Sequence, residues 1–93
     1  MKVLVTGFEP FGNNIENSSW VVANKVVTQN TFDIALELMP VSFKRVAKAL
    51  RTAVAKHNPN LIIMLGQAGS SDTVRLERIA INMMDARSAD NDG

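Results

Sequence analysis

Two short apolar runs, each followed by a glycine, constrain the fold of this chain more than any other feature. Residues 2–7 read KVLVTG and residues 61–66 read LIIMLG. Runs of this length without interruption are typical of strands that are buried on both faces of a parallel sheet. The chain is therefore predicted to fold around a parallel sheet, with its first strand over residues 2–6 and a later one over residues 61–65.

Helical periodicity fills the stretches between the predicted strands. Apolar residues at spacings of three and four predict a helix that is capped by Ser18 or Ser19 and runs through residue 26 or 27. A second helix is predicted from the N-cap Ser42 to near His57, where Asn and Pro follow. The loop between the first strand and the first helix is long and holds glycine, proline and asparagine, a composition typical of functional loops.

Period-two alternation predicts two further strands. Residues 32–39 alternate apolar and polar side chains and are expected near an edge of the sheet, and residues 74–84 show a similar alternation. The order β-α-β-α-β-β indicates an α/β fold with right-handed crossovers and a mostly parallel sheet. Two helices cannot cover four such strands, so one face is expected to lie exposed until a further segment or a partner chain covers it.

The composition excludes several classes of function. The 93 residues carry a net charge of +1, with basic and acidic side chains interspersed, so neither nucleic acid nor an anionic membrane is an expected partner. No stretch approaches the roughly 20 apolar residues of a membrane span, and the N-terminal run is too short for a signal peptide, so we expect a cytoplasmic protein. No grouping has metal-ligand spacing, and neither a metal nor another cofactor is expected.

Six short blocks of sequence resemble one family. Residues 6–12, TGFEPFG, resemble the opening signature of type I pyroglutamyl peptidases, also called pyrrolidone-carboxylate peptidases. The other blocks follow in family order: residues 17–20 (NSSW), 40–43 (PVSF), 66–69 (GQAG), 77–82 (ERIAIN) and 85–87 (DAR). The resemblance implies an open α/β/α sandwich, and residues 1–93 would be the N-terminal part of a single peptidase domain.

The resemblance also implies an activity that this chain lacks the residues to perform alone. Members of the family remove N-terminal pyroglutamate from peptides with a Cys-His-Glu triad, and many are homo-oligomers. Their Cys and His lie further along the chain than residue 93, and this sequence has no cysteine. Glu77 matches the acidic member of the triad. We therefore expect an inactive fragment that forms a homo-oligomer or associates with the missing C-terminal part.

The chemistry of such a peptidase explains the match at Glu77. A carboxylate bonded to one imidazole nitrogen fixes the tautomer of the histidine and stabilises the imidazolium beside a thiolate. The alternative is an exposed glutamate paired with Arg75 or Arg78. Arg87 resembles the family's arginine beside the nucleophile, where its charge would support a thiolate or an oxyanion. A surface ion pair with a nearby aspartate is the alternative for Arg87.

Three residues are candidates for binding the pyroglutamate ring. This small neutral lactam needs flat apolar walls and a few hydrogen-bonding groups. Phe8 and Phe11 resemble such walls. The alternative is that both pack as ordinary core residues at the top of the sheet. Gln67 follows a buried strand at the carboxyl edge of the sheet, and its amide both donates and accepts hydrogen bonds. A solvated loop glutamine is the alternative reading of Gln67.

Two other functions stay open at this level. The chain would be a non-catalytic binding or assembly module if the native product were this short. Dinucleotide binding is a weaker alternative, because a Thr-Gly pair ends the first strand but no Gly-x-Gly-x-x-Gly follows. Bulky Phe8 and Phe11 would also crowd a backbone that must approach a pyrophosphate closely.

Overall fold

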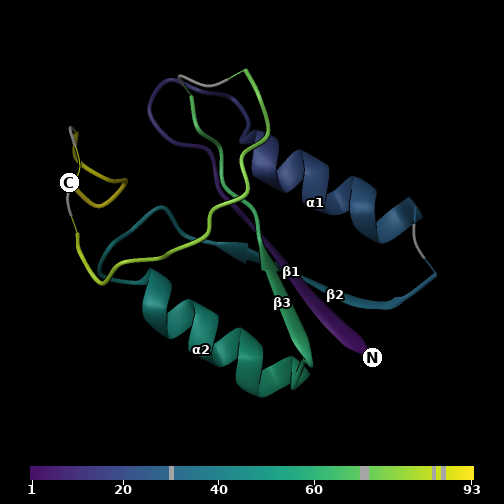
Figure 1. The fold of residues 1–93 in the computed structure, drawn as a ribbon. Coiled ribbons are helices and arrows are strands. Elements are labelled where there is room, and N and C mark those ends of the chain that lie inside the picture. The colour runs from purple at the N-terminus through teal and green to yellow at the C-terminus, as the bar shows by residue number, and fades with distance from the viewer. Residues whose placement is uncertain (30, 70–71, 85, 87) are drawn as a thin grey trace.

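The chain folds as a three-stranded parallel sheet with one helix on each face. The computed structural model describes residues 1–29, 31–69, 72–84, 86 and 88–93. The elements follow in the order β1 (Lys2–Phe8), α1 (Ser18–Gln29), β2 (Asp33–Met39), α2 (Val46–His57) and β3 (Leu61–Met64) (Figure 1). The strand order is β2-β1-β3, and β1 pairs in parallel with both neighbours. The predicted α/β class, the parallel sheet and the edge position of β2 are confirmed.

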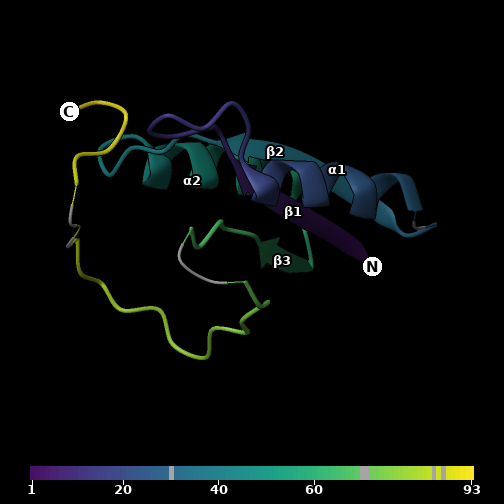
Figure 2. The ribbon, with the colours of Figure 1, turned by 90° about the horizontal axis from the view of Figure 1, so that it is seen from above.

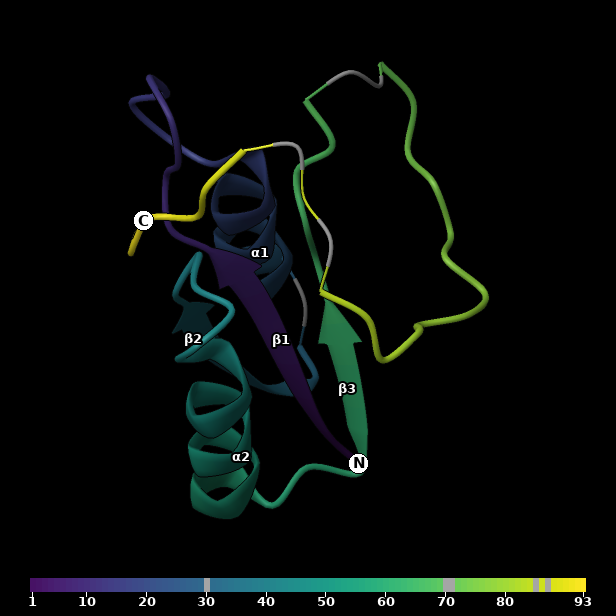
Figure 3. The same ribbon diagram turned by 90° about the vertical axis from the view of Figure 1, so that its left-hand side faces the viewer.

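Side chains of β1 alternate between the two helices. Val3 and Val5 pack with Ala23 of α1, whereas Leu4 packs with Ala53 of α2. The two helices accordingly lie on opposite sides of β1 (Figure 3). Because β1 has a strand on each edge and a helix on each face, its apolar run is buried throughout, as the sequence predicts.

Two boundaries differ from the predicted ones. Gly7 does not end β1, because the ladder with β2 continues through Gly7↔Leu38 to Phe8↔Met39. Neither Ser18 nor Ser19 caps α1. Asn17 does so, since its Oδ1 accepts the Ser19 N–H at 3.0 Å. Helix α1 also continues beyond residue 27, to Gln29.

The end of α2 agrees with the sequence, but the predicted N-cap is wrong. The helix begins at Val46, and its N-cap residue is Arg45, which makes no side-chain cap. Ser42 caps the turn that leads into the helix: its Oγ accepts the Arg45 N–H at 3.0 Å, and its carbonyl accepts the Val46 N–H at 3.0 Å. The helix ends at His57, and the next residue, Asn58, adopts the left-handed conformation with φ 46°. An asparagine tolerates this conformation well, which explains the helix stop.

The predicted strand over residues 74–84 does not form. This segment is coil, and it lies apart from the layer of helices and strands (Figure 2). Its alternating apolar side chains are exposed, including Ile79, Ile81 and Met83. A strand needs a neighbour that satisfies its backbone groups, and this segment pairs with none of the three strands.

The uncovered apolar surface also differs from the expected one. Each helix packs on β1 and β2, so neither face of the sheet is wholly bare. Instead β3 is partly exposed on both faces. Leu61 and Ile63 pair with Val3 and Val5, so they lie on the α1 side, and Met64 is 63% exposed. Among the described helices, none is long and apolar enough to cross a membrane.

Candidate functional site

The loop after β1 lies at the carboxyl edge of the sheet, where open α/β folds bind their ligands. Gly7 brings this loop and the start of α1 together. A Cβ at Gly7 would lie 2.9 Å from the Cα of Trp20 and 3.0 Å from the carbonyl carbon of Ser19. No side chain fits this gap, so a glycine is required for the close approach of strand and helix.

A buried pair of side chains fixes the first part of the loop to α1. Asn17 and Ser19 are both buried. The Ser19 hydroxyl donates to Asn17 Oδ1 at 2.6 Å and accepts the Phe8 N–H at 2.9 Å. The amide nitrogen of Asn17 donates to the carbonyl of Glu9 at 3.0 Å. Side chains at the start of α1 thus hold the Phe8 N–H and the Glu9 carbonyl by hydrogen bonds.

A small pocket opens beside this loop. Its volume is about 210 Å³, and its walls come from three segments that follow β1, β2 and β3. The lining residues are Phe8, Phe11, Asn17, Val41, Gly66 and Gln67. The structure therefore brings together all three residues that the sequence indicates for binding a lactam. Two half-buried aromatic rings and the side-chain amides of Asn17 and Gln67 give the pocket apolar walls and a few polar groups.

Gln67 also connects β3 to α1. Its Oε1 accepts the Ser18 N–H at 2.7 Å, so the side chain lies against the first turn of α1. With the carbonyl oxygen engaged in this way, the amide nitrogen carries the remaining donors of the side chain. This contact orients Gln67 and joins the β3 exit to the other pocket walls.

The structure does not bring Glu77, the predicted catalytic carboxylate, to this pocket. Glu77 is exposed in the coil after β3 and is not among the pocket-lining residues. Arg87 lies outside the described residues. The three residues predicted to bind the ring therefore share one pocket, whereas Glu77 stands apart from it.

Sequence reasoning missed Asn17 and Glu9, which hold the pocket walls. Glu9 Oε1 accepts the Val41 N–H at 2.9 Å, and the Glu9 N–H donates to the Met39 carbonyl at 3.1 Å. Both residues lie within the recognised blocks, but their roles depend on contacts across the fold. The signal that indicates Asn17 is its place just before the helix, because asparagine is as good an N-cap as serine.

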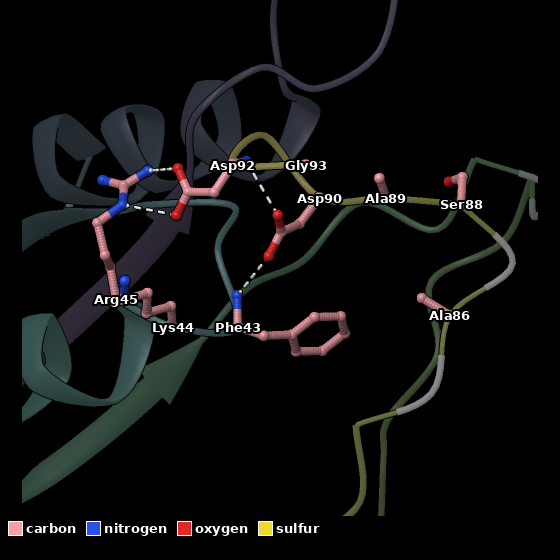
Figure 4. A pocket seen from close by; sticks show the side chains of 9 residues that line it. All are labelled: Phe43, Lys44, Arg45, Ala86, Ser88, Ala89, Asp90, Asp92 and Gly93. Carbon is pink, nitrogen blue, oxygen red and sulfur yellow. Dashed lines mark hydrogen bonds and ion pairs between the residues drawn. The ribbon is translucent and has the colours of Figure 1, made fainter.

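A larger, open depression of about 950 Å³ lies next to the turn before α2 (Figure 4). Arg45 and Asp92 form a two-point ion pair across it, with Nε–Oδ2 and Nη2–Oδ1 distances of 2.9 and 2.8 Å. Hydrogen bonds from Arg45, and then from Ser42, lower the pKa of Asp92 to about 2. Phe8, Phe11, Gln67 and Glu77, the predicted site residues that the structure describes, do not line this depression.

The single histidine lies away from the pocket. His57 Nε2 is 2.7 Å from Glu37 Oε1, and Lys56 Nζ is 3.5 Å from the same oxygen. The hydrogen bond with His57 is the main cause that lowers the pKa of Glu37. This pair joins the end of α2 to β2.

Comparison with known proteins gives the same match along the whole chain. The family model described as pyroglutamyl peptidase matches residues 1–93. The chain is 42% identical to the pyrrolidone-carboxylate peptidase of Bacillus subtilis, covering 99% of this chain and 44% of the relative. It is 39% identical to that of Gloeobacter violaceus, covering 100% and 46% respectively.

Solved structures agree with the sequence matches. The crystal structure of Bacillus amyloliquefaciens pyroglutamyl peptidase I superposes with a TM-score of 0.90 at 40% identity, covering 99% of this chain and 46% of that one. A mutant pyrrolidone carboxyl peptidase from Pyrococcus furiosus gives a TM-score of 0.87 at 36% identity and the same 46% coverage. The chain thus spans about half the length of the relatives it matches.

Proposed function

Since the chain belongs to the pyroglutamyl peptidase family, we propose that it supplies the N-terminal part of a single peptidase domain that removes N-terminal pyroglutamate from peptides. The nucleophilic cysteine and the catalytic histidine come from a second stretch of polypeptide, because this chain contains no cysteine. On its own the chain does not hydrolyse peptides. Its contribution is the binding pocket and the carboxylate of the triad.

One observation carries this proposal: Phe8, Phe11 and Gln67 line the same pocket. The volume of about 210 Å³ is below the roughly 300–1,000 Å³ of pockets for drug-sized ligands and suits a five-membered lactam. The two phenyl rings contact the faces and edges of the ring. The amide of Gln67 hydrogen-bonds the lactam amide and so distinguishes pyroglutamate from a purely apolar ring.

Glu77 and Arg87 complete the site when the second polypeptide is bound. Glu77 accepts a hydrogen bond from the catalytic imidazole and holds it in the productive tautomer. Arg87 places a positive charge near the thiolate or the oxyanion. For this to happen, residues 74–84 must leave their coil conformation and join the sheet, which their alternating apolar pattern favours.

The second polypeptide binds on the β3 side of the sheet. Strand β3 has one unpaired edge, and Leu61, Ile63 and Met64 are 42–63% exposed. The additional strands and helices of the same domain bury this surface and supply the strand with which residues 74–84 would pair. Assembly into homo-oligomers, as in many family members, follows once the domain is complete.

Complementation in solution tests the proposal. The chain is mixed with the remaining C-terminal half of the Bacillus amyloliquefaciens relative, and hydrolysis of pyroglutamyl-7-amino-4-methylcoumarin is followed by fluorescence. We expect hydrolysis from the mixture and none from either part alone. Glu77→Ala is expected to lower turnover by about a hundredfold or more while the two parts still associate, because the imidazole loses its fixed orientation.

The controls separate the peptidase from the second candidate, a non-catalytic binding or assembly module. A C-terminal half with its nucleophilic cysteine changed to alanine must bind the chain without restoring hydrolysis. The absence of cysteine favours the second candidate as well. A stable oligomer of the chain alone, together with no hydrolysis in any mixture, would establish the assembly module instead. Activity that is unchanged in Glu77→Ala would remove Glu77 from the triad.

A further inference from the structure

Three consecutive residues near the C-terminus contact both loops that form one side of the pocket. We refer to Asp90, Asn91 and Asp92 as the clasp. These residues cross the molecule at the carboxyl end of β1, close to the loop that follows this strand (Figure 3). Their partners lie 45 or more positions earlier in the sequence, in the loops that follow β1 and β2.

Asn91 is the central contact of the clasp. Its Nδ2 donates to Glu9 Oε1 at 3.0 Å and to the Pro10 carbonyl at 2.9 Å. Its backbone N–H donates to the Val41 carbonyl at 3.0 Å. Glu9 Oε1 also accepts the Val41 N–H, so a single carboxylate oxygen joins Asn91 to the second loop. Val41 lines the pocket, and Pro10 lies between the two phenylalanines that line it.

The flanking aspartates anchor Asn91 in place. Asp90 Oδ2 accepts the Phe43 N–H at 2.7 Å, and Asp90 Oδ1 accepts the Asp92 N–H at 2.9 Å (Figure 4). Asp92 pairs with Arg45 and accepts a hydrogen bond from the Ser42 hydroxyl. The clasp is therefore fixed to the turn before α2 at two points, and Asn91 reaches from there to the Glu9 carboxylate and the Pro10 carbonyl.

The two aromatic walls of the pocket depend on Asn91 to different extents. Phe8 is held by the buried Ser19 hydroxyl. Phe11 follows an exposed proline, and its carbonyl is held locally by the exposed Asn14, at 2.9 Å from Asn14 Nδ2. Asn91 is the long-range partner of the Pro10 carbonyl next to Phe11. Loss of this contact would release the Phe11 wall and leave the Phe8 wall in place.

From this arrangement we propose that Asn91 is a positioning residue for the lactam pocket: it sets the separation of the Phe11 and Val41 walls. The proposal rests on the proposed function in one respect, that the pocket binds a lactam ring. Asn91 touches no ligand itself. It acts through Glu9 and Pro10, and the two aspartates of the clasp hold it in position against them.

Asn91→Asp is the sharpest test, because it preserves the shape of the side chain and replaces the donor with a carboxylate that faces Glu9 and the Pro10 carbonyl. Two measurements are made on the ¹⁵N-labelled 93-residue chain: amide hydrogen exchange, and the affinity for 2-pyrrolidone by chemical-shift titration. We expect faster exchange at the Val41 N–H and a dissociation constant that rises about threefold to tenfold, the loss that corresponds to one hydrogen bond. Amides of the β1 centre and of α1 should keep their exchange rates.

Asn24→Asp is the matched control, since Asn24 is exposed on α1 and its side chain bonds the Trp20 carbonyl of its own helix. It should leave both readouts unchanged. Unchanged exchange at Val41, or faster exchange with unchanged affinity for 2-pyrrolidone, would overturn the positioning role. Equal acceleration of all core amides would also overturn it. If the unaltered chain binds no 2-pyrrolidone, the proposed function fails at the pocket, and the exchange at Val41 still decides whether Asn91 holds the loop.

Discussion

In β1, Leu4 is fully buried and Val5 is 1% exposed, whereas in the coil after β3 Leu76 is 92% exposed and Ile81 69% exposed. Both regions carry an apolar pattern that predicts a strand. The first lies between two strands and two helices, and the second pairs with none of the three described strands. The difference shows that the local pattern selects which side chains would face a core, while the presence of packing partners decides whether the strand forms.

Helix α1 and strand β3 extend the same comparison. Ala23 of α1 is fully buried against β1, but Ile63 of β3 is 42% exposed although it belongs to the same sheet. Burial of such apolar surface is favourable, so binding of a polypeptide that covers it is favoured. The buried part of the chain accounts for its fold, and the exposed part is the surface that we assign to the second polypeptide.

Of the substitutions considered, Leu4→Ala is expected to lower the free energy of unfolding the most. Removal of a fully buried leucine side chain from the core between β1 and α2 should lower the free energy of unfolding by about 2–5 kcal/mol. Leu76→Ala, in the coil, should change it by less than about 0.5 kcal/mol. Urea denaturation followed by the fluorescence of Trp20, which packs against the core, measures both. Similar losses in the two variants would mean that the coil is packed in solution.

Gly7→Ala should give the next largest effect. The new Cβ would meet backbone atoms of Ser19 and Trp20 at 2.9–3.0 Å, and backbone cannot rotate away, so we expect a loss of about 1–3 kcal/mol. Gly66→Ala is the control, because nothing lies within 4 Å of its Cβ position. The same denaturation experiment applies. If both glycines tolerate alanine equally, the close approach of β1 and α1 is not tight in solution.

Asn17→Ala should cost less, about 1–2 kcal/mol, since it removes the cap of α1 and the partner of the buried Ser19 hydroxyl. The exposed Asn24→Ala should be close to neutral in comparison. Thermal unfolding by circular dichroism compares the two. A neutral Asn17→Ala would show that water or another side chain replaces the cap.

The sequence predicts the sheet and its two helices better than it predicts the coil after β3. The strands at β1 and β3, both helices and the three pocket residues follow from periodicity and from the family blocks. The cap of α1 could not be chosen from residue preference, because Asn17, Ser18 and Ser19 are all good caps and only the hydrogen-bond geometry separates them. Asn91 could not be found at all, since its partner Glu9 is 82 positions away.

The smallest expected effect concerns pH and the clasp. The pKa of Asp92 is lowered from its ordinary value of 3.8 to about 2, by Arg45 first and then by Ser42. Because the folded-state pKa lies below the unfolded one, the ionised group stabilises the fold above pH 3.8, and this contribution is lost as the pH falls from there to about 2. The pair is exposed, so the effect on global stability should be small and local. The Arg45 N–H bonds Ser42 Oγ, which in turn bonds Asp92, and Arg45 Nε bonds Asp92 directly. We therefore expect the amide and Nε shifts of Arg45, measured by NMR, to titrate near pH 2 in the unaltered chain and to lose this step in Asp92→Asn. A midpoint at the ordinary value of 3.8 would mean that the clasp does not hold Arg45 in solution, whereas the core amides of β1 should not report this step in either case.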